Sequence, residues 1–214
     1  MVSEWQRRPR LLPILFASAP ETSALYCKKL RRITSPKATS DYIQGSARPD
    51  SDGTVLVSGE NGSHRKLRAK AILIATGSRP FRPENISFDI PGVCDTDTIL
   101  HRGRVPKDII IVGGGAVGVE FATICPVLGA KVTVLDRASR LMTMMDAEVS
   151  AIMEELFIRW GVQILFGSSI ENVAQKGNGL EVRLTTGETL RPDTLLFAAG
   201  RVANTQDLGL EAAV

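Results

Sequence analysis

Glycines in the middle of the chain have a spacing that suits a phosphate-binding loop. The stretch 109–120 reads IIIVGGGAVGVE and contains the pattern G-x-G-x-x-G. The first glycine allows a tight turn off a strand, the second lets a pyrophosphate approach the backbone, and the third lets the next helix pack closely. The pattern therefore predicts that the N–H groups at a helix N-terminus hold the phosphates of a dinucleotide. The loop residues are Gly113, Gly114, Gly115, Ala116, Val117 and Gly118.

The elements around this loop favour a nucleotide site over an ordinary glycine-rich turn. Four apolar residues, 109–112, precede the loop and predict a buried strand. An amphipathic helix is expected to follow and to end at Gly129. The next strand, 131–135, is closed by Asp136, where an acid roughly 20 residues after the loop would accept hydrogen bonds from ribose hydroxyls. The helix is predicted to carry its apolar side on Val117, Phe121, Ile124 and Leu128.

Asp136 also bears on the choice of dinucleotide. Its carboxylate favours the free 2′-hydroxyl of NAD and repels the 2′-phosphate of NADP. Arg137 and Arg140 follow closely and could offset that repulsion, although a solvated basic strand end is the simpler interpretation of both. NAD is therefore the expected cofactor, and NADP stays open as an alternative.

The residues after Asp136 continue an alternation of helix and strand. Asp146 is a favourable N-cap for a helix that ends at Gly161, and a strand is predicted over 162–166. Hairpin turns follow, and a last buried strand over 194–199 stops at Gly200. This order predicts an α/β fold with a doubly wound, Rossmann-type parallel sheet. The apolar positions of the second helix are Val149, Ile152, Met153, Leu156, Phe157 and Trp160.

The part of the chain before residue 90 has a different pattern. Residues 1–40 show no periodicity, whereas 53–58 and 66–71 predict a β-hairpin. The apolar run 71–75 predicts a strand buried on both faces. Prolines at 80, 83 and 91 are typical of a linker, so a domain boundary is expected between residues 80 and 95.

Composition limits the other possibilities. The net charge of +3 and the 5% aromatic content give no sign of a nucleic-acid groove. No apolar run approaches the roughly 18 residues of a membrane span. Cys27, Cys94 and Cys125 are odd in number and far apart, which argues against a disulfide framework or a zinc or other metal site and favours a cytoplasmic location.

Four segments stand in the order typical of FAD-dependent pyridine nucleotide-disulphide oxidoreductases, which the chain resembles over residues 41–213. They are ILIATGSRP (72–80), IIIVGGGAVGVEFA (109–122), VTVLDRASRLM (132–142) and LLFAAGRVANTQDLGLEAA (195–213). The resemblance implies a Rossmann-type NAD(P)-binding domain inserted in a partial FAD-binding domain. Residues 1–40 would be an irregular N-terminal segment, 41–90 part of the FAD domain, 91–200 the NAD(P) domain and 201–214 the return to the FAD domain.

The resemblance also implies roles for further residues. Gly113 through Glu120 would hold NAD together with Asp136, and Glu120 would lie near the nicotinamide unless it is merely a surface charge. Ile170 and Gly200 would contribute backbone contacts to NAD. The residues implied to line FAD, or otherwise to form a plain turn, are Ala47, Thr76, Gly77 and Ser78.

Within the family, SFDIPGVCDTDTIL (87–100) and GRVANTQDLGLE (200–211) are most similar to the soluble, Si-specific pyridine nucleotide transhydrogenases. The chain nevertheless lacks the FAD glycine loop and the dimerisation domain that the resemblance leads one to expect, so FAD binding is doubtful and truncation at both ends is expected. Pro126 also departs from the family pattern by interrupting the first helix.

Three functions follow from these observations. The first is a truncated transhydrogenase-like oxidoreductase that passes hydride between NADPH and NAD through FAD. The second is a non-catalytic NAD-binding module, and the third is a dihydrolipoamide dehydrogenase-like enzyme. The segment DTDTIL favours the first over the third, and no CxxxxC redox pair supports the third. No catalytic residue is assigned.

Overall fold

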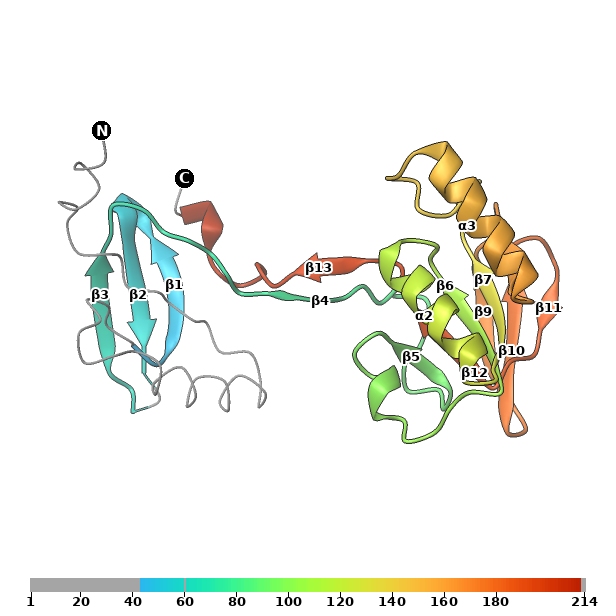
Figure 1. Cartoon of the computed structure of the whole chain (residues 1–214). Coiled ribbons are helices and arrows are strands. Elements are labelled where there is room, and N and C mark those ends of the chain that lie inside the picture. The colour runs from blue at the N-terminus through green and yellow to red at the C-terminus, as the bar shows by residue number, and fades with distance from the viewer. Residues whose placement is uncertain (1–42, 60, 213–214) are drawn as a thin grey trace. The chain divides into compact units, whose positions relative to one another are not determined.

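The computed structural model describes residues 43–59 and 61–212, which divide into two units. The second unit is Arg79–Val202, and the first contains the described residues on either side of it. The connecting segments β4 (Ser78–Pro80) and β13 (Arg201–Ala203) pair in a two-stranded sheet (Figure 1). The division lies earlier than the expected 80–95 because residues such as Ile86, 6% exposed, belong to the core of the second unit.

A five-stranded parallel sheet forms the centre of the second unit, which confirms the predicted α/β fold class. The segments that connect its strands include helices and an antiparallel three-stranded sheet. The strand order across the parallel sheet is β5 (Val93–Asp95), β12 (Thr194–Phe197), β6 (Asp108–Val112), β7 (Lys131–Leu135) and β8 (Gln163–Leu165).

Alternation along the parallel strands sends side chains to two separate cores. Ile109 and Ile111 join the cluster formed with helix residues such as Ala122, whereas Ile110 joins the cluster on the other face. That second cluster includes residues of the antiparallel sheet, for example Val182. The unit is therefore layered as helices, parallel sheet and antiparallel sheet. The antiparallel strands are β9 (Ile170–Lys176), β10 (Gly179–Leu184) and β11 (Thr189–Leu190), and a short 3-10 turn, η2 (Ile99–His101), follows β5.

The helix α2 (Ala116–Val127) begins directly after the glycine loop, and Gly129, with φ +87°, follows its end as predicted. Its buried face differs from the prediction. Gly118, Val119, Ala122 and Cys125 are buried, whereas Ile124 is 52% and Leu128 57% exposed. The small residues face the sheet because the helix approaches the backbone of the loop too closely for large side chains. Of the predicted positions, Val117 and Phe121 pack partly buried against the helix-side core, whereas Ile124 and Leu128 point outward.

The helix α3 (Ala147–Arg159) forms where it was predicted, with Asp146 at the N-cap position and Gly161 just beyond its end. Phe157 is buried in the helix-side core and Met153 packs against it. The other predicted apolar positions are exposed, so only part of the stripe faces the sheet. No helix in the described part of the chain is both long and apolar enough to cross a membrane.

The first unit contains an antiparallel sheet of β1 (Ser46–Asp50), β2 (Thr54–Ser58) and β3 (His64–Arg68), with 3-10 turns η1 (Ser51–Gly53) and η3 (Leu210–Ala212). The predicted hairpin is β2 and β3. The predicted buried strand over 71–75 is wrong, because this segment has no assigned strand structure and Leu73 is 82% exposed. An extended apolar run becomes a buried strand only beside neighbouring strands, and the described residues place none there.

Candidate dinucleotide site

The glycine loop lies where the connectivity of the parallel sheet changes direction. From β6 the chain proceeds through α2 to β7 on one side, whereas β12 lies on the other side of β6. In open α/β sheets, ligands bind outside the carboxyl ends of the strands at such a switch point. Residues 113–115 follow the carboxyl end of β6 and therefore occupy this position (Figure 1).

The backbone geometry separates the roles of the three pattern glycines. Gly113 has φ +112°, and a Cβ there would lie 2.6 Å from the carbonyl oxygen of Ala198. A Cβ on Gly118 would overlap the carbonyl oxygen of Gly113. A Cβ on Gly115, in contrast, would meet no atom within 4 Å. Two glycines are therefore required by packing within the protein, while the third faces open space.

The first turn of α2 is suited to an anion. Gly115 is the N-cap residue with extended backbone (φ −79°, ψ −175°), and no side chain of the described residues caps the helix. The first N–H groups of an α-helix have no intrahelical acceptor and carry the positive end of the helix dipole. No acidic residue lies in this first turn. A pyrophosphate would therefore find N–H donors and the open side of Gly115 together.

Asp136 connects the end of β7 to this loop. Its Oδ2 atom accepts a 2.5 Å hydrogen bond from the N–H of Gly114, and its Oδ1 atom accepts one of 2.7 Å from the N–H of Ala138. The side chain is half-buried. Carboxylate oxygens have further lone pairs beyond these two bonds, so Asp136 can still accept from a ribose hydroxyl. The structure brings this residue and the loop together, as the sequence predicted.

The segment after Asp136 closes over the loop, which the sequence did not predict. The N–H of Met142 donates to the carbonyl of Gly114 over 2.8 Å, and Leu141 is fully buried. The N–H of Leu141 in turn donates to Oε1 of Glu154 on α3 over 2.8 Å. Both backbone groups of Gly114 are therefore held: Asp136 accepts from its N–H, and the N–H of Met142 donates to its carbonyl oxygen. Glycine spacing gives no signal for them.

Arg140 has a structural role here. Its Nη1 atom donates to Ser150 Oγ over 2.9 Å and to the carbonyl of Met145 over 2.8 Å, and its Nη2 atom donates to the carbonyl of Thr143 over 2.9 Å. This guanidinium fixes the 143–145 loop to the start of α3. Arg137 is exposed, as expected for a basic strand end.

The other three residues expected to contact NAD differ in their location and burial. Glu120 is exposed on the second turn of α2. Gly200 is exposed with φ +108°, two residues beyond Ala198, whose carbonyl oxygen leaves no room for a Cβ on Gly113. Ile170 begins β9 and packs partly buried against the core shared with the antiparallel sheet. Glu120 lies on the helix that follows the loop and Gly200 lies between β12 and β13, and the roles of Glu120, Gly200 and Ile170 in binding NAD stay predictions.

A family model described as pyridine nucleotide-disulphide oxidoreductase matches residues 26–214. The chain belongs to this family. It is 42% identical over 173 residues to a soluble pyridine nucleotide transhydrogenase of Colwellia psychrerythraea, covering 81% of this chain and 37% of the relative. The corresponding protein of Pseudomonas fluorescens is 37% identical over 171 residues, with 80% and 37% covered. The chain therefore spans little more than a third of the length of these curated relatives.

Two solved structures share the fold. The HOCl-induced flavoprotein disulfide reductase RclA of Escherichia coli matches with a TM-score of 0.73 and 27% identity, and 89% of this chain and 43% of that chain are covered. LpdA of Mycobacterium tuberculosis matches with a TM-score of 0.75 and 25% identity, with the same shares covered. These likenesses agree with the Rossmann-like architecture of the second unit.

The family binds FAD as well as nicotinamide dinucleotides, and the residues expected to line FAD lie in or beside the first unit. Ala47 and Thr76 line a common cavity of about 30 Å³. The Thr76 hydroxyl donates to the carbonyl of Asn204 over 2.7 Å, and the Asn204 N–H donates to the carbonyl of Gly77 over 3.0 Å. Ser78 begins β4. Ligand sites typically measure about 300–1,000 Å³, so this cavity by itself does not fit a flavin.

The described cysteines form no redox site. Burial raises the pKa of the Cys94 thiol to about 11, although the nearby Arg102 opposes that shift. Burial likewise raises the pKa of Cys125. Both thiols are free and buried, and Cys27 lies outside the described residues. Buried thiols kept protonated in this way are poor nucleophiles, which disfavours a redox role for Cys94 and Cys125.

Proposed function

We propose that the chain binds a nicotinamide dinucleotide at the glycine loop and supplies this site to a flavin-dependent oxidoreductase of the transhydrogenase type. The observation that carries the proposal is the contrast among the glycines. Gly113 and Gly118 are closed in by the protein, whereas Gly115 faces open space beside the uncapped start of α2. A loop held rigidly on two sides and open on the third is what close approach of a pyrophosphate requires.

Each part of the site then has a defined task. The N–H groups at the start of α2 bind the phosphates, and Asp136 accepts hydrogen bonds from the adenosine ribose while it holds Gly114 in place. Glu120 and Gly200 border the nicotinamide end. A bound nicotinamide supplies or accepts the hydride of the family's reactions.

NAD is the favoured dinucleotide. A 2′-phosphate would bring negative charge next to the Asp136 carboxylate, which disfavours NADP. The Arg140 guanidinium keeps its charge, but its hydrogen bonds to Ser150 and to two carbonyl groups of the following loop direct it to this loop, so we do not expect it to contact a 2′-phosphate. Arg137 remains as the exposed cation beside the site.

Exchange of hydride between NADPH and NAD by such enzymes requires the flavin as a relay. The cavity that Ala47 and Thr76 share measures about 30 Å³, which is too small to hold a flavin by itself. This favours a second candidate function, a module that binds NAD without catalysing turnover. A dihydrolipoamide dehydrogenase-like reaction is disfavoured by the buried, protonated thiols of Cys94 and Cys125. Because Cys94 and Cys125 are free thiols, we also propose a cytoplasmic location.

The test is a titration of the purified full-length chain with NADH and with NADPH, followed by nucleotide fluorescence and by calorimetry. We expect saturable binding of NADH, binding of NADPH weaker by at least about tenfold, and a colourless preparation. A lack of saturable NADH binding would overturn the proposal. A stoichiometric flavin absorbance band that persists through purification would instead reject the non-catalytic module and favour the complete oxidoreductase.

A further inference from the structure

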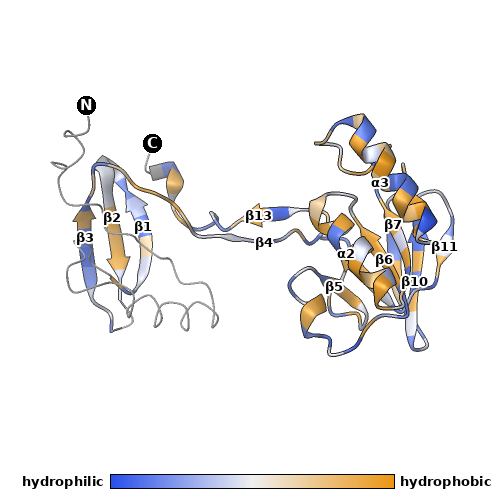
Figure 2. Cartoon of the chain, in the orientation of Figure 1, coloured by the Kyte–Doolittle hydropathy of each residue, from blue (hydrophilic) through white to orange (hydrophobic). Residues whose placement is uncertain are grey.

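The helix α3 binds the segment that follows Asp136 at two neighbouring points. This helix carries hydrophilic as well as hydrophobic positions (Figure 2). Ser150 and Glu154 are four residues apart and therefore lie on one face of it. The Oγ atom of Ser150 accepts from Arg140 Nη1 over 2.9 Å, and Oε1 of Glu154 accepts from the N–H of Leu141 over 2.8 Å. Two residues of the helix thus hold two consecutive residues of the segment.

The hydrogen bond to Glu154 satisfies a backbone group that solvent does not reach. Leu141 is fully buried, whereas Glu154 is half-buried on the helix. A buried N–H that loses its acceptor is costly, because it cannot exchange that acceptor for water without a movement of the chain. Removal of the Glu154 carboxylate should therefore displace the backbone at Leu141.

Met142, the next residue, has a backbone conformation that its neighbours must maintain. Its φ of +48° lies in the left-handed region, which is disfavoured for a residue with a Cβ. The N–H of Met142 donates to the carbonyl of Gly114 over 2.8 Å, and its own carbonyl accepts from the N–H of Met145 over 2.7 Å. Such conformations persist only where the surrounding contacts over-determine them. Release of Leu141 should let Met142 leave this conformation and its bond to Gly114.

Gly114 connects this segment to the phosphate loop. A Cβ at Gly114 would lie 2.6 Å from Cδ2 of Leu141, so the leucine side chain packs directly on the glycine. Gly115, the N-cap residue of α2, follows Gly114 in the chain. A shift of Leu141 or Met142 is therefore passed to the residue that precedes the first N–H donors of the helix.

We propose that Glu154 is a positioning residue for the candidate dinucleotide site. Through Leu141 and Met142 it holds Gly114, and with it the phosphate loop, in the conformation that binds a pyrophosphate. The inference rests on the proposed function, because it takes the glycine loop as the phosphate site. A loop that is already held in its binding conformation loses less conformational freedom on binding than one that the ligand must order.

Variants of Glu154 test this role by their affinity for NADH, measured by calorimetry on the folded chain. Glu154→Leu keeps a side chain of similar size but removes the acceptor, and it should weaken NADH binding about tenfold. Glu154→Gln keeps an oxygen acceptor and should stay within about threefold of the wild type. Glu155→Leu is the matched control, because Glu155 is the next residue of α3, is 64% exposed and pairs only with Arg159 among the described residues. It should bind NADH as the wild type does.

A second measurement needs no nucleotide. Amide hydrogen exchange, followed by NMR, reports on the bond between the Met142 N–H and the Gly114 carbonyl. In Glu154→Leu the Met142 amide should exchange at least about tenfold faster. The Gly113 amide, which donates to the carbonyl of Leu135 over 2.8 Å, should keep its wild-type rate. A purely structural role of Glu154 would instead speed both amides through a loss of global stability and leave the NADH affinity of the folded chain unchanged.

Each outcome decides a separate point. Wild-type NADH affinity in Glu154→Leu would overturn the inference, and so would an unchanged exchange rate of the Met142 amide, since water then replaces the carboxylate. Equal losses of affinity in Glu154→Leu and Glu154→Gln would also reject it, because glutamine retains the acceptor. A wild-type chain that fails to bind NADH would overturn the proposed function, and the Met142 exchange rate would still decide whether Glu154 holds the loop.

Discussion

The carboxylate of Asp136 accepts a hydrogen bond of 2.5 Å from the backbone N–H of Gly114. One residue at the end of β7 thereby fixes the shape of the loop that follows β6, before any ligand is present. This relationship connects the two halves of the candidate dinucleotide site, the phosphate loop and the ribose acceptor. Loss of the Asp136 side chain should therefore affect both halves.

We predict that Asp136→Ala weakens NADH binding by about 1–3 kcal/mol, the cost of leaving hydrogen bonds to a charged group unmade. This corresponds to a loss on the order of tenfold to a hundredfold in the dissociation constant. Isothermal titration calorimetry provides the measurement. Arg137→Ala is the neighbouring control and should leave the NADH affinity nearly unchanged, because Arg137 is exposed and we expect it to act only on a 2′-phosphate, which NADH lacks. Equal affinity in wild-type and Asp136→Ala would remove the ribose assignment.

Two glycine substitutions should separate folding from binding. Gly118→Ala should lower the free energy of unfolding by several kcal/mol, because its Cβ would overlap the Gly113 carbonyl oxygen in a close-packed region. Gly115→Ala should leave stability within about 1 kcal/mol of wild type, since its Cβ meets nothing within 4 Å and its φ of −79° suits alanine. NADH binding should nevertheless be lost in Gly115→Ala. Urea denaturation and the NADH titration measure the two effects, and a Gly115→Ala protein that is folded and binds normally would argue against a phosphate site.

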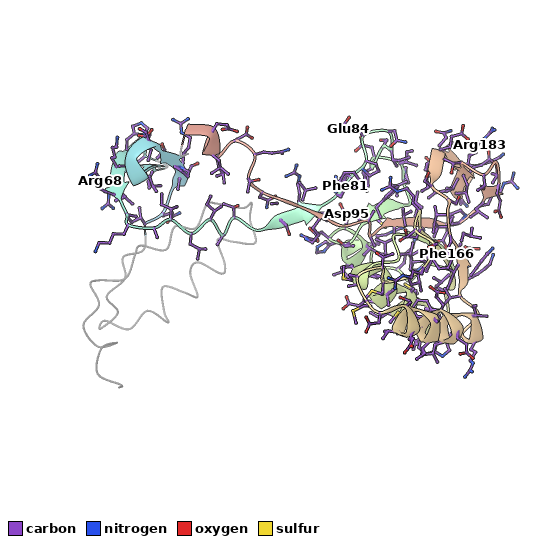
Figure 3. The ribbon with its side chains drawn as sticks, turned by 90° about the horizontal axis from the view of Figure 1, so that it is seen from above. Arg68, Phe81, Glu84, Asp95, Phe166 and Arg183 are labelled. Carbon is purple, nitrogen blue, oxygen red and sulfur yellow. The ribbon has the colours of Figure 1, made fainter. Side chains whose placement is uncertain are left out.

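The ion pair of Asp95 should make stability depend on acid pH. Asp95 is 1% exposed at the end of β5 (Figure 3). Burial disfavours its charged form, but hydrogen bonds from the Thr98 backbone and from Arg82 outweigh this and hold the pKa of Asp95 below its usual 3.8. A lowered folded-state pKa means that the stabilisation is present above the unfolded-state pKa and is lost as the pH falls through the folded-state pKa.

Asp95→Asn should therefore reduce the free energy of unfolding at neutral pH by about 1–3 kcal/mol and flatten its fall at acid pH. The cost is smaller than for a fully buried pair because the Arg82 side chain, 51% exposed, can be hydrated when its partner is lost. Denaturant unfolding between neutral pH and about pH 3 measures it. Lys131→Ala, which breaks an exposed pair with Asp108, should cost less than about 1 kcal/mol. Parallel pH profiles for wild type and Asp95→Asn would contradict the assignment.

The buried thiols should be inert in the folded protein. In a Cys27→Ser background, Cys94 and Cys125 should resist a thiol reagent at neutral pH and react in denaturant, because burial raises the pKa of both. Since the Cys94 pKa rises from 9.0 to about 11, the unfolded state ionises first, and stability should fall as the pH rises from 9 towards 11. Rapid labelling of either thiol in the native protein would show that the site is accessible and reopen a redox role.

The sequence by itself determined the order of elements from β6 onward and the position of the candidate phosphate loop, but not β5, which lies in the segment predicted to be a linker. These features depend on local rules: apolar periodicity distinguishes strand from helix, and glycine spacing specifies a turn that admits a phosphate. Asp136 could be recognised for the same reason, because the strand that it closes fixes its distance from the loop.

Only the tertiary structure decided which surfaces of those elements are covered. The apolar run 71–75 reads as a buried strand, yet it is exposed because a strand requires neighbours that local sequence does not specify. The helix α2 turns Gly118 and Ala122 inward and leaves Ile124 outside, since close approach to the loop backbone outweighs the burial of larger side chains. Arg140 donates to the 143–145 loop, and its partners come from segments that only folding brings together. The periodicity of apolar residues indicates which side chains an element could bury, whereas tertiary packing determines which of them are buried.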